Sequence, residues 1–233
     1  RELKHNEFLK TYFWNTLLKN RYPGAQSERI AKDFDLLIDT KISLSEKLNK
    51  MINENTRSFN DLENTSTDKI KLIDAHYSNR SQQIYRAMLL LLKSKSAKDF
   101  YNGFTPLKDV LNENKLEEHH IFPKRSTVGK EITKRYENHK YDDIINNIAN
   151  VALITKETNN KRIGSKLPST YITEFEKAYK DSKKYGEFIE IMESQFISPD
   201  MIELLKNDDF DEFIVERTKL LHQQIEELCK IKE

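Results

Sequence analysis

Apolar residues recur at helical spacing along almost the whole chain, and this pattern limits the fold more than any other feature. It predicts helices over about residues 8–18, 27–38, 43–52 and 84–92. The last of these is apolar on most sides, which indicates the most buried helix of the N-terminal half. The sequence therefore predicts a mainly α protein.

Glycine content supports the same conclusion. Only 5 of the 233 residues are glycine, about 2%, whereas about 7% is usual. This argues against a β-sandwich, a Rossmann sheet and a P-loop protein. Residues 55–68 read as a loop or a weak helix, a long helix begins near Tyr171 with a break or kink at Gly186, and the last helix covers about 210–228.

The chain shows no sign of a membrane or disulfide-bonded protein. Its longest apolar run, 87–92, is six residues, far short of the ~20 that span a bilayer. The single cysteine, Cys229, excludes an internal disulfide and fits a reducing compartment. We therefore expect a cytoplasmic protein with no membrane partner. Because the first residue is Arg1, we also expect a piece of a longer polypeptide.

Residues 116–166 depart from the helical pattern. A first strand leads into His119-His120 and is followed by a polar excursion over 126–143, predicted to be a long loop. The short β-branched run 148–154 predicts a second strand. A helix of about two turns follows, with Thr155 as its N-cap and Gly164 just past its end. Function is expected here.

The histidine pair suits phosphodiester hydrolysis. This reaction needs a base for the attacking water and a cation to offset charge on the phosphorane and leaving oxygen. Neighbouring strand side chains point to opposite faces, so His119 and His120 divide these tasks only if the strand ends or twists there. Pro123 fits such an ending. Asn159 would supply a second metal ligand from the helix.

The residues His119-His120-Ile-Phe-Pro123-Lys, then Asn150-Val-Ala-Leu-Ile, then Asn159 resemble an HNH (ββα-metal, His-Me finger) nuclease. More narrowly, the chain is similar to the C-terminal nuclease region of GmrSD-type restriction proteins, which cut modified foreign DNA. The stretches 12–15 with 21–24, and 85–92 with 97–100, also resemble that family.

This resemblance implies a role for each matched residue. His120 would be the general base, and His119 a metal ligand where many HNH enzymes have Asp. Asn150 would brace the loop and orient the base. Asn159 would be the second metal ligand; Asn160 is the alternative, although the nine-residue spacing from Asn150 favours Asn159.

The resemblance also implies a metal and partners. Imidazole suits Zn, Ni or Mn better than Mg, which prefers oxygen; we expect Mg or Mn to support activity, with Zn or Ni as alternatives in crystals. DNA, modified or foreign, would be the substrate. An upstream NTPase and modification-sensing domain of the same polypeptide would be a partner, since its acidic-Gly-Gln motif is absent here.

Each candidate residue also has a structural interpretation. The histidine pair alone is common at surfaces and in cores, and Asn150 is a common turn former. Glu117 and Glu118 could reach the site, but a solvent-facing role is expected; His139 could swing toward the metal, but no role is expected for it. Basic residues flank the site and would hold phosphates, or else form a solvated basic face: Lys124, Arg125, Lys161, Arg162 and Lys166.

Two other functions compete with the nuclease. One is a non-catalytic helical DNA-binding or interaction module with a decayed nuclease site. The other is a structural zinc module built on His119, His120 and His139, which lacks cysteine ligands at usable spacing.

Charge separates the chain into the regions that we expect as domains. Net charge is +1 overall, but residues 1–116 carry +5, 117–166 carry +3 and 167–233 carry −7. We expect an N-terminal helical region, 1–115, that links to the upstream domain. It would be followed by a ββα-metal nuclease core, 116–170, and an acidic helical region, 171–233, packed on the rest. A local basic face suffices for phosphate contacts.

Overall fold

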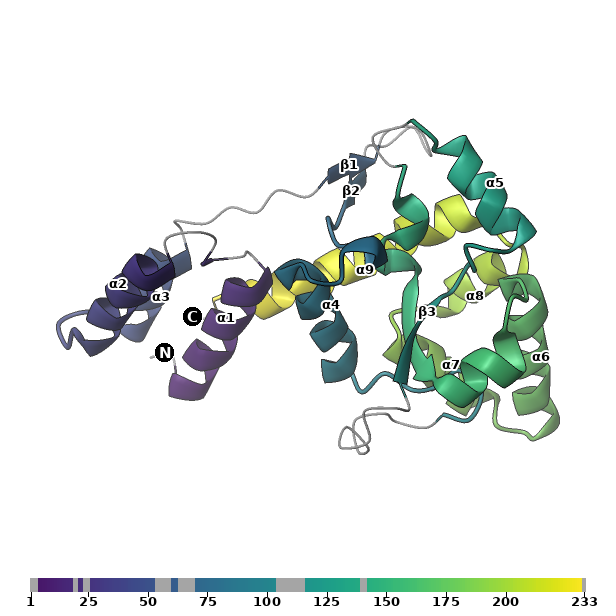
Figure 1. Ribbon diagram of the computed structural model, residues 1–233. Helices are drawn as coiled ribbons and strands as arrows, with labels where there is room; N and C mark the ends of the chain where they lie inside the picture. The colour runs from purple at the N-terminus through teal and green to yellow at the C-terminus, as the bar shows by residue number, and fades with distance from the viewer. Residues whose placement is uncertain are drawn as a thin grey trace. The chain divides into compact units, whose positions relative to one another are not determined.

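The computed structural model describes residues 4–18, 21–22, 26–52, 60–62, 70–103, 116–138 and 142–231. It is mainly helical with small two-stranded antiparallel sheets, which confirms the predicted fold class at this level (Figure 1). No helix in these ranges is long and apolar enough to cross a membrane.

Contacts divide the chain into two compact units, residues 1–59 with 222–233 and residues 60–221. The C-terminal helix α9, Phe210–Cys229, contributes residues to both. The boundaries of the two units therefore differ from those of the three regions expected from sequence.

The smaller unit contains the three N-terminal helices, α1 (His5–Leu18), α2 (Gln26–Ile38) and α3 (Leu44–Ile52). Their bounds confirm the helices predicted from spacing. The unit's apolar core contains Phe8, Leu48 and Met51, with Tyr12, Leu36, Leu44, Ile52 and Ile231 packed against it.

The larger unit contains two strand pairs and the remaining helices. Its elements are β1 (Asn60–Leu62), β2 (Ile70–Leu72), α4 (Gln83–Ser94), β3 (Leu116–His120), α5 (Thr127–Arg135), β4 (Val151–Thr155), α6 (Pro168–Asp181), α7 (Tyr185–Ser194), α8 (Pro199–Lys206) and the first part of α9. Short 3-10 turns lie at 77–79, 144–146 and 148–150.

Two predictions in this unit are wrong. Residues 60–62, expected in a loop or weak helix, form β1 and pair with β2; the rest of 55–68 lies outside the described residues. Residues 127–135, expected in a long loop, form α5. Ser126 caps α5 by accepting a hydrogen bond from the Gly129 amide at 3.0 Å, and Ile132 is buried.

The strand pair β3–β4, whose long connection contains α5, positions the candidate site. The strands are antiparallel, with His119 opposite Ala152 and His120 opposite Val151. Four consecutive residues of β4, 151–154, are buried, and α4 packs against this strand. The strand begins three residues later than predicted because 148–150 form a 3-10 turn.

The helical turn after β4 has the predicted ends. Thr155 Oγ1 accepts a hydrogen bond from the Thr158 amide at 3.2 Å, as an N-cap does. Residues 158–163 form a π-helical turn that ends at Gly164, whose φ is +59°. Asp99 is fully buried and accepts hydrogen bonds from the Thr155 amide (2.7 Å) and the Thr158 hydroxyl (2.8 Å), which anchors this turn.

The helices α6, α7 and α8 pack against one another (Figure 1). The break predicted at Gly186 lies between α6 and α7, where Lys183 adopts a φ of +60°. Gly186 itself lies in the first turn of α7. The left-handed residue that ends the helix is therefore a lysine, which the composition did not indicate.

Candidate active site

The two adjacent histidines have separate surroundings because β3 continues through both. The ladder pairs His119 and His120 with successive residues of β4, so their side chains point to opposite faces. The Ile121 amide extends this pairing by donating to the Asn150 carbonyl at 2.9 Å. β3 ends at His120, where the sequence predicted an end, but both histidines are still paired in the ladder, so the strand does not end early enough to bring the two side chains to one face.

His119 is buried, 4% exposed, and its ring contacts Asn159. Nδ1 lies 3.0 Å from Oδ1 of Asn159, and the Asn159 amide NH2 donates to Glu117. Burial, aided by the neighbouring His120, lowers the pKa of His119 to about 3, against the effect of the Asn159 hydrogen bond. His119 is therefore a neutral imidazole at physiological pH, the form that binds metals.

His119 and Asn159 bring a ring nitrogen and an amide oxygen, two kinds of metal-ligand atom, within 3.0 Å of each other. In this structure the contact is a hydrogen bond from Nδ1 to Oδ1, so an ion held by both atoms would take the place of the Nδ1 proton. Glu117 holds the amide so that its oxygen faces His119. Asn160 is exposed, so Asn159 is the residue that the structure brings to His119.

Few other protein ligands are near. Within the described ranges no group of three or more His, Cys, Asp or Glu side chains could hold a metal ion. The Nε2 atom of His119 is buried without a hydrogen-bond partner in the part of the chain described, and the ring meets Tyr171 edge-on.

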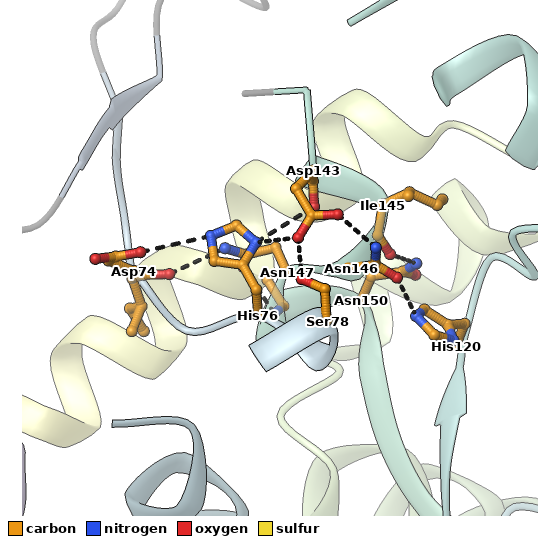
Figure 2. Close-up of polar contacts among 11 residues, drawn as sticks. Asp74, His76, Ser78, His120, Asp143, Ile145, Asn146, Asn147 and Asn150 are labelled. Atoms are coloured by element: carbon orange, nitrogen blue, oxygen red, sulfur yellow. Dashed lines mark hydrogen bonds and ion pairs between the residues drawn. The ribbon is translucent and has the colours of Figure 1, made fainter. Parts of the chain in front are cut away.

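His120 is partly buried on the other face of the strand pair, and its ring meets the Asn146 side chain (Figure 2). Its Nε2 lies 3.0 Å from Oδ1 of Asn146, and its ring packs edge-on against Tyr77 at 4.5 Å between centroids. Burial is the main cause that lowers the pKa of His120, and the positive charges of Lys124 and Arg80 lower it further. The ring is thus a neutral base with cations nearby.

Asn150 braces the turn that follows β3. Its Oδ1 accepts from the Phe122 amide at 2.9 Å, and its Nδ2 donates to the carbonyls of Phe122 (3.1 Å) and Ile145 (2.8 Å). The side chain is fully buried. It joins 121–122 to 145–150.

The five basic residues divide into two groups. Lys124 and Arg125 are exposed at the turn after β3, and no ion-pair partner is found for them in the described parts of the chain. The other three already have partners. Lys161 pairs with Glu157 at 3.2 Å, Lys166 pairs with Glu174 at 2.7 Å, and Arg162 lies over the Tyr101 ring at 4.2 Å.

Sequence reasoning missed several residues of the site. Glu117 and Glu118 were expected to face solvent, but Glu117 binds Asn159 and Glu118 accepts from the Tyr85 hydroxyl at 2.7 Å. Asn146 and Asp143 were not singled out, although a polar Asp-x-x-Asn-Asn run beside apolar residues was the available signal. His139 lies outside the described residues.

The Asn146 contact leads to a further polar cluster, shown in Figure 2. Asn146 Nδ2 donates to Asp143, which also accepts from the Ser78 hydroxyl. His76 lies beside it, with Nδ1 3.5 Å from the Asp143 carboxylate, while Nε2 lies 3.7 Å from Asp74. A connected set of side chains therefore extends from His120 to the segment before α4.

Sequence comparison gives one informative match. The chain is 27% identical over 251 residues to MJ0686, an uncharacterized protein of Methanocaldococcus jannaschii, in an alignment that covers 97% of this chain and 38% of the relative. The chain thus spans well under half of that relative's length. No protein-family model and no solved structure matches the sequence.

Proposed function

We propose that this chain is a metal-dependent DNA endonuclease or nickase domain of an antiphage restriction system, similar to the HNH region of GmrSD-type proteins. The observation that carries the proposal is the His119–Asn159 contact of 3.0 Å. This contact joins β3 to the helical turn that follows β4, and these elements occur in the strand–strand–helix order of a ββα-metal site. His119 and Asn159 are also the two positions to which the resemblance gives the metal.

Each residue has a role in this proposal. His119 and Asn159 would hold a divalent ion, Mg or Mn in activity, which supplies charge to offset the phosphorane and leaving oxygen. His120 takes the proton of the attacking water at Nδ1, which has no hydrogen-bond partner among the described residues. Asn150 holds the turn that carries the base.

Phosphate binding would fall first to Lys124 and Arg125, since Lys161, Arg162 and Lys166 have to leave existing contacts to bind DNA. Modified or foreign DNA is the proposed substrate. An upstream NTPase and modification-sensing domain of the same polypeptide is the proposed partner that directs cleavage.

Replacing the base tests this function. In a supercoiled-plasmid assay with Mg²⁺ or Mn²⁺, His120→Ala is expected to slow nicking by at least about 10²-fold, because a general base contributes about 10²–10⁴. EDTA is expected to stop nicking by the parent. His5→Ala removes an exposed histidine of α1 and serves as the matched control.

The same assay separates the nuclease from a decayed DNA-binding module. The separate surroundings of His119 and His120 are the observation that favours the latter. If the parent binds DNA but never nicks it, with either metal and with modified plasmid, the chain is a binding module. If His120→Ala nicks as fast as the parent, the base is a different residue.

A further inference from the structure

An asparagine between a histidine and a carboxylate can control where the histidine carries its proton. A side-chain amide presents an oxygen at one end and an NH2 group at the other, and either end fits the same space. The end that faces the imidazole decides whether the ring nitrogen it meets is a donor or an acceptor. Asn146 lies in this position between His120 and Asp143.

Asp143 decides the orientation of Asn146. A carboxylate offers acceptors alone, so the Asn146 NH2 has to face Asp143 and the Asn146 oxygen has to face His120. The oxygen 3.0 Å from Nε2 of His120 can only accept, and Nε2 therefore carries the proton. The lone pair of the neutral ring is left on Nδ1.

Asp143 is itself held by donors. The Ser78 hydroxyl donates to its carboxylate, and Nδ1 of His76 lies 3.3 Å from its backbone carbonyl and 3.5 Å from its carboxylate (Figure 2). These donors occupy the acceptor positions that Asn146 does not use. The carboxylate is thus fixed from the side opposite to His120.

The backbone around this cluster is fixed as well. The Ile148 amide donates to the Ala75 carbonyl at 2.8 Å, and the Asn147 side chain donates to the Ile73 carbonyl at 2.9 Å. Both contacts join residues 73–75 to 147–148, so the segment before α4 supports the segment before β4. The support is buried, since Ile73, Ala75 and Asn147 are each 1% exposed or less.

We propose that Asp143 and Asn146 are positioning residues that hold His120 in the tautomer protonated at Nε2, with the lone pair on Nδ1 for the attacking water. The kinetic consequence rests on the proposed nuclease function, whereas the tautomer itself does not. When Nδ1 takes a proton from water, the Nε2–H bond to Asn146 is kept, and the water is left as hydroxide.

Nitrogen NMR of ¹⁵N-histidine-labelled protein tests the tautomer directly, with the His120 signals assigned by their loss in His120→Ala. The parent is expected to show a protonated Nε2 and an unprotonated Nδ1. Asp143→Asn is expected to populate the other tautomer, because an amide at position 143 no longer selects one end of Asn146. Asp142→Asn makes the same charge change at an exposed neighbour and is expected to change nothing.

Two variants of Asn146 extend this test. Asn146→Leu removes the acceptor and is expected to mix the tautomers. The double variant Asp143→Asn/Asn146→Asp exchanges the acid and the amide, keeps an acceptor at His120, and is expected to restore the Nε2–H form that Asp143→Asn alone loses. Should the leucine variant fail to fold, the isosteric Asp143→Asn variant still decides the matter. A parent ring protonated at Nδ1, or a tautomer unchanged in a folded Asp143→Asn protein, overturns the proposal.

Kinetics then separate this inference from the function. We expect Asp143→Asn to lower the kcat of nicking about tenfold and Asn146→Leu about 10²-fold, with KM unchanged, because the base and not DNA binding is affected. Unchanged kcat despite a shifted tautomer overturns the positioning role. If the parent does not nick, the proposed function fails, and the NMR result alone still decides the tautomer.

Discussion

At the scale of single residues, each histidine of the pair meets an asparagine oxygen whose NH2 group is held by an acid. Glu117 and Asn159 serve His119, and Asp143 and Asn146 serve His120. In both cases the carboxylate fixes an amide that has two chemically different ends. The sequence predicted both histidines and Asn159 beside His119, but it did not predict Asn146 beside His120, because that contact depends on which amide the fold brings within 3.0 Å.

A second buried cluster, in the smaller unit, makes stability depend on pH. Asp33 accepts hydrogen bonds from Arg21 (2.7 Å), Tyr22 (2.6 Å) and Tyr12 (3.0 Å). Burial raises the pKa of Asp33, but these bonds and the guanidinium charge outweigh it, so its pKa lies below the ordinary 3.8. The folded state therefore binds the carboxyl proton less tightly than the unfolded state does.

The sign of the effect follows from linkage. Asp33 contributes its stability above about pH 4, and this contribution is lost as pH falls through its lowered folded pKa. Asp33→Asn is expected to lower the free energy of unfolding by about 3–5 kcal/mol near pH 7, because the buried charge of Arg21 loses its carboxylate partner.

Urea unfolding of parent and Asp33→Asn from pH 7 to pH 2 measures both effects. The difference in unfolding free energy should shrink below about pH 4. Asp35→Asn, an exposed neighbour on α2, is the control. A difference that stays constant down to pH 2 would show that Asp33 titrates alike in both states.

At the scale of elements, α5 shows how one glycine permits a close approach. A Cβ atom at Gly129 would lie 2.2 Å from the Pro123 carbonyl oxygen and 2.8 Å from that of Lys124, and both are backbone atoms. Ser126 meets the same carbonyl, donating to Pro123 at 2.6 Å while it caps the helix. The first turn of α5 is therefore packed directly on the turn that follows His120.

Two glycine-to-alanine substitutions should change the free energy of unfolding in opposite directions. Gly129→Ala is expected to lower the free energy of unfolding by about 3 kcal/mol, because backbone has to move to admit the methyl group. Gly186→Ala, in α7 with nothing within 4 Å of the new Cβ, is expected to raise it by about 0.5–1 kcal/mol. Ser126→Ala should cost about 1 kcal/mol as a lost cap. Urea titrations of the three variants check this order, and a neutral Gly129→Ala would contradict the close packing.

At the scale of the whole molecule, the described part of the larger unit is joined by buried polar side chains from distant helices. Gln195, at the end of α7, bonds to both backbone groups of Leu153 and so covers the free edge of β4. Arg217 of α9 is fully buried and donates to the carbonyls of Ala149 (2.8 Å) and Gln195 (2.9 Å). Burial lowers the pKa of Arg217 to about 9, so it remains charged at neutral pH.

Removing Arg217 should therefore affect the whole larger unit. Arg217→Met is expected to lower the free energy of unfolding by about 3–5 kcal/mol, because two buried carbonyls lose their hydrogen-bond donor. Arg135→Met, in α5, breaks a partly exposed ion pair with Asp211, which lies on α9 as Arg217 does. This variant is expected to lose about 1 kcal/mol or less of unfolding free energy. Thermal unfolding by circular dichroism compares the two; equal losses would contradict the role given to Arg217.

The sequence by itself determined the features that depend on neighbours along the chain. These are the positions of most helices, the Thr155 cap, the Gly164 end and the spacing of His119, Asn150 and Asn159, because backbone periodicity and capping act within a few residues. The short strand β1 and the helix α5 were missed because each depends on backbone contacts that hydrophobic periodicity does not reveal. β1 pairs with β2, and Gly129 of α5 packs against the Pro123 carbonyl.

Only the tertiary structure decided which groups surround the histidines. The continuous β3 ladder placed His119 and His120 on opposite faces, and Asn146 reached His120 from 26 residues away. His76 reached Asp143 from a segment 67 residues distant. Such contacts follow from the packing of buried surfaces, which local sequence patterns do not encode, and they determine which nitrogen of His120 is free to accept a proton.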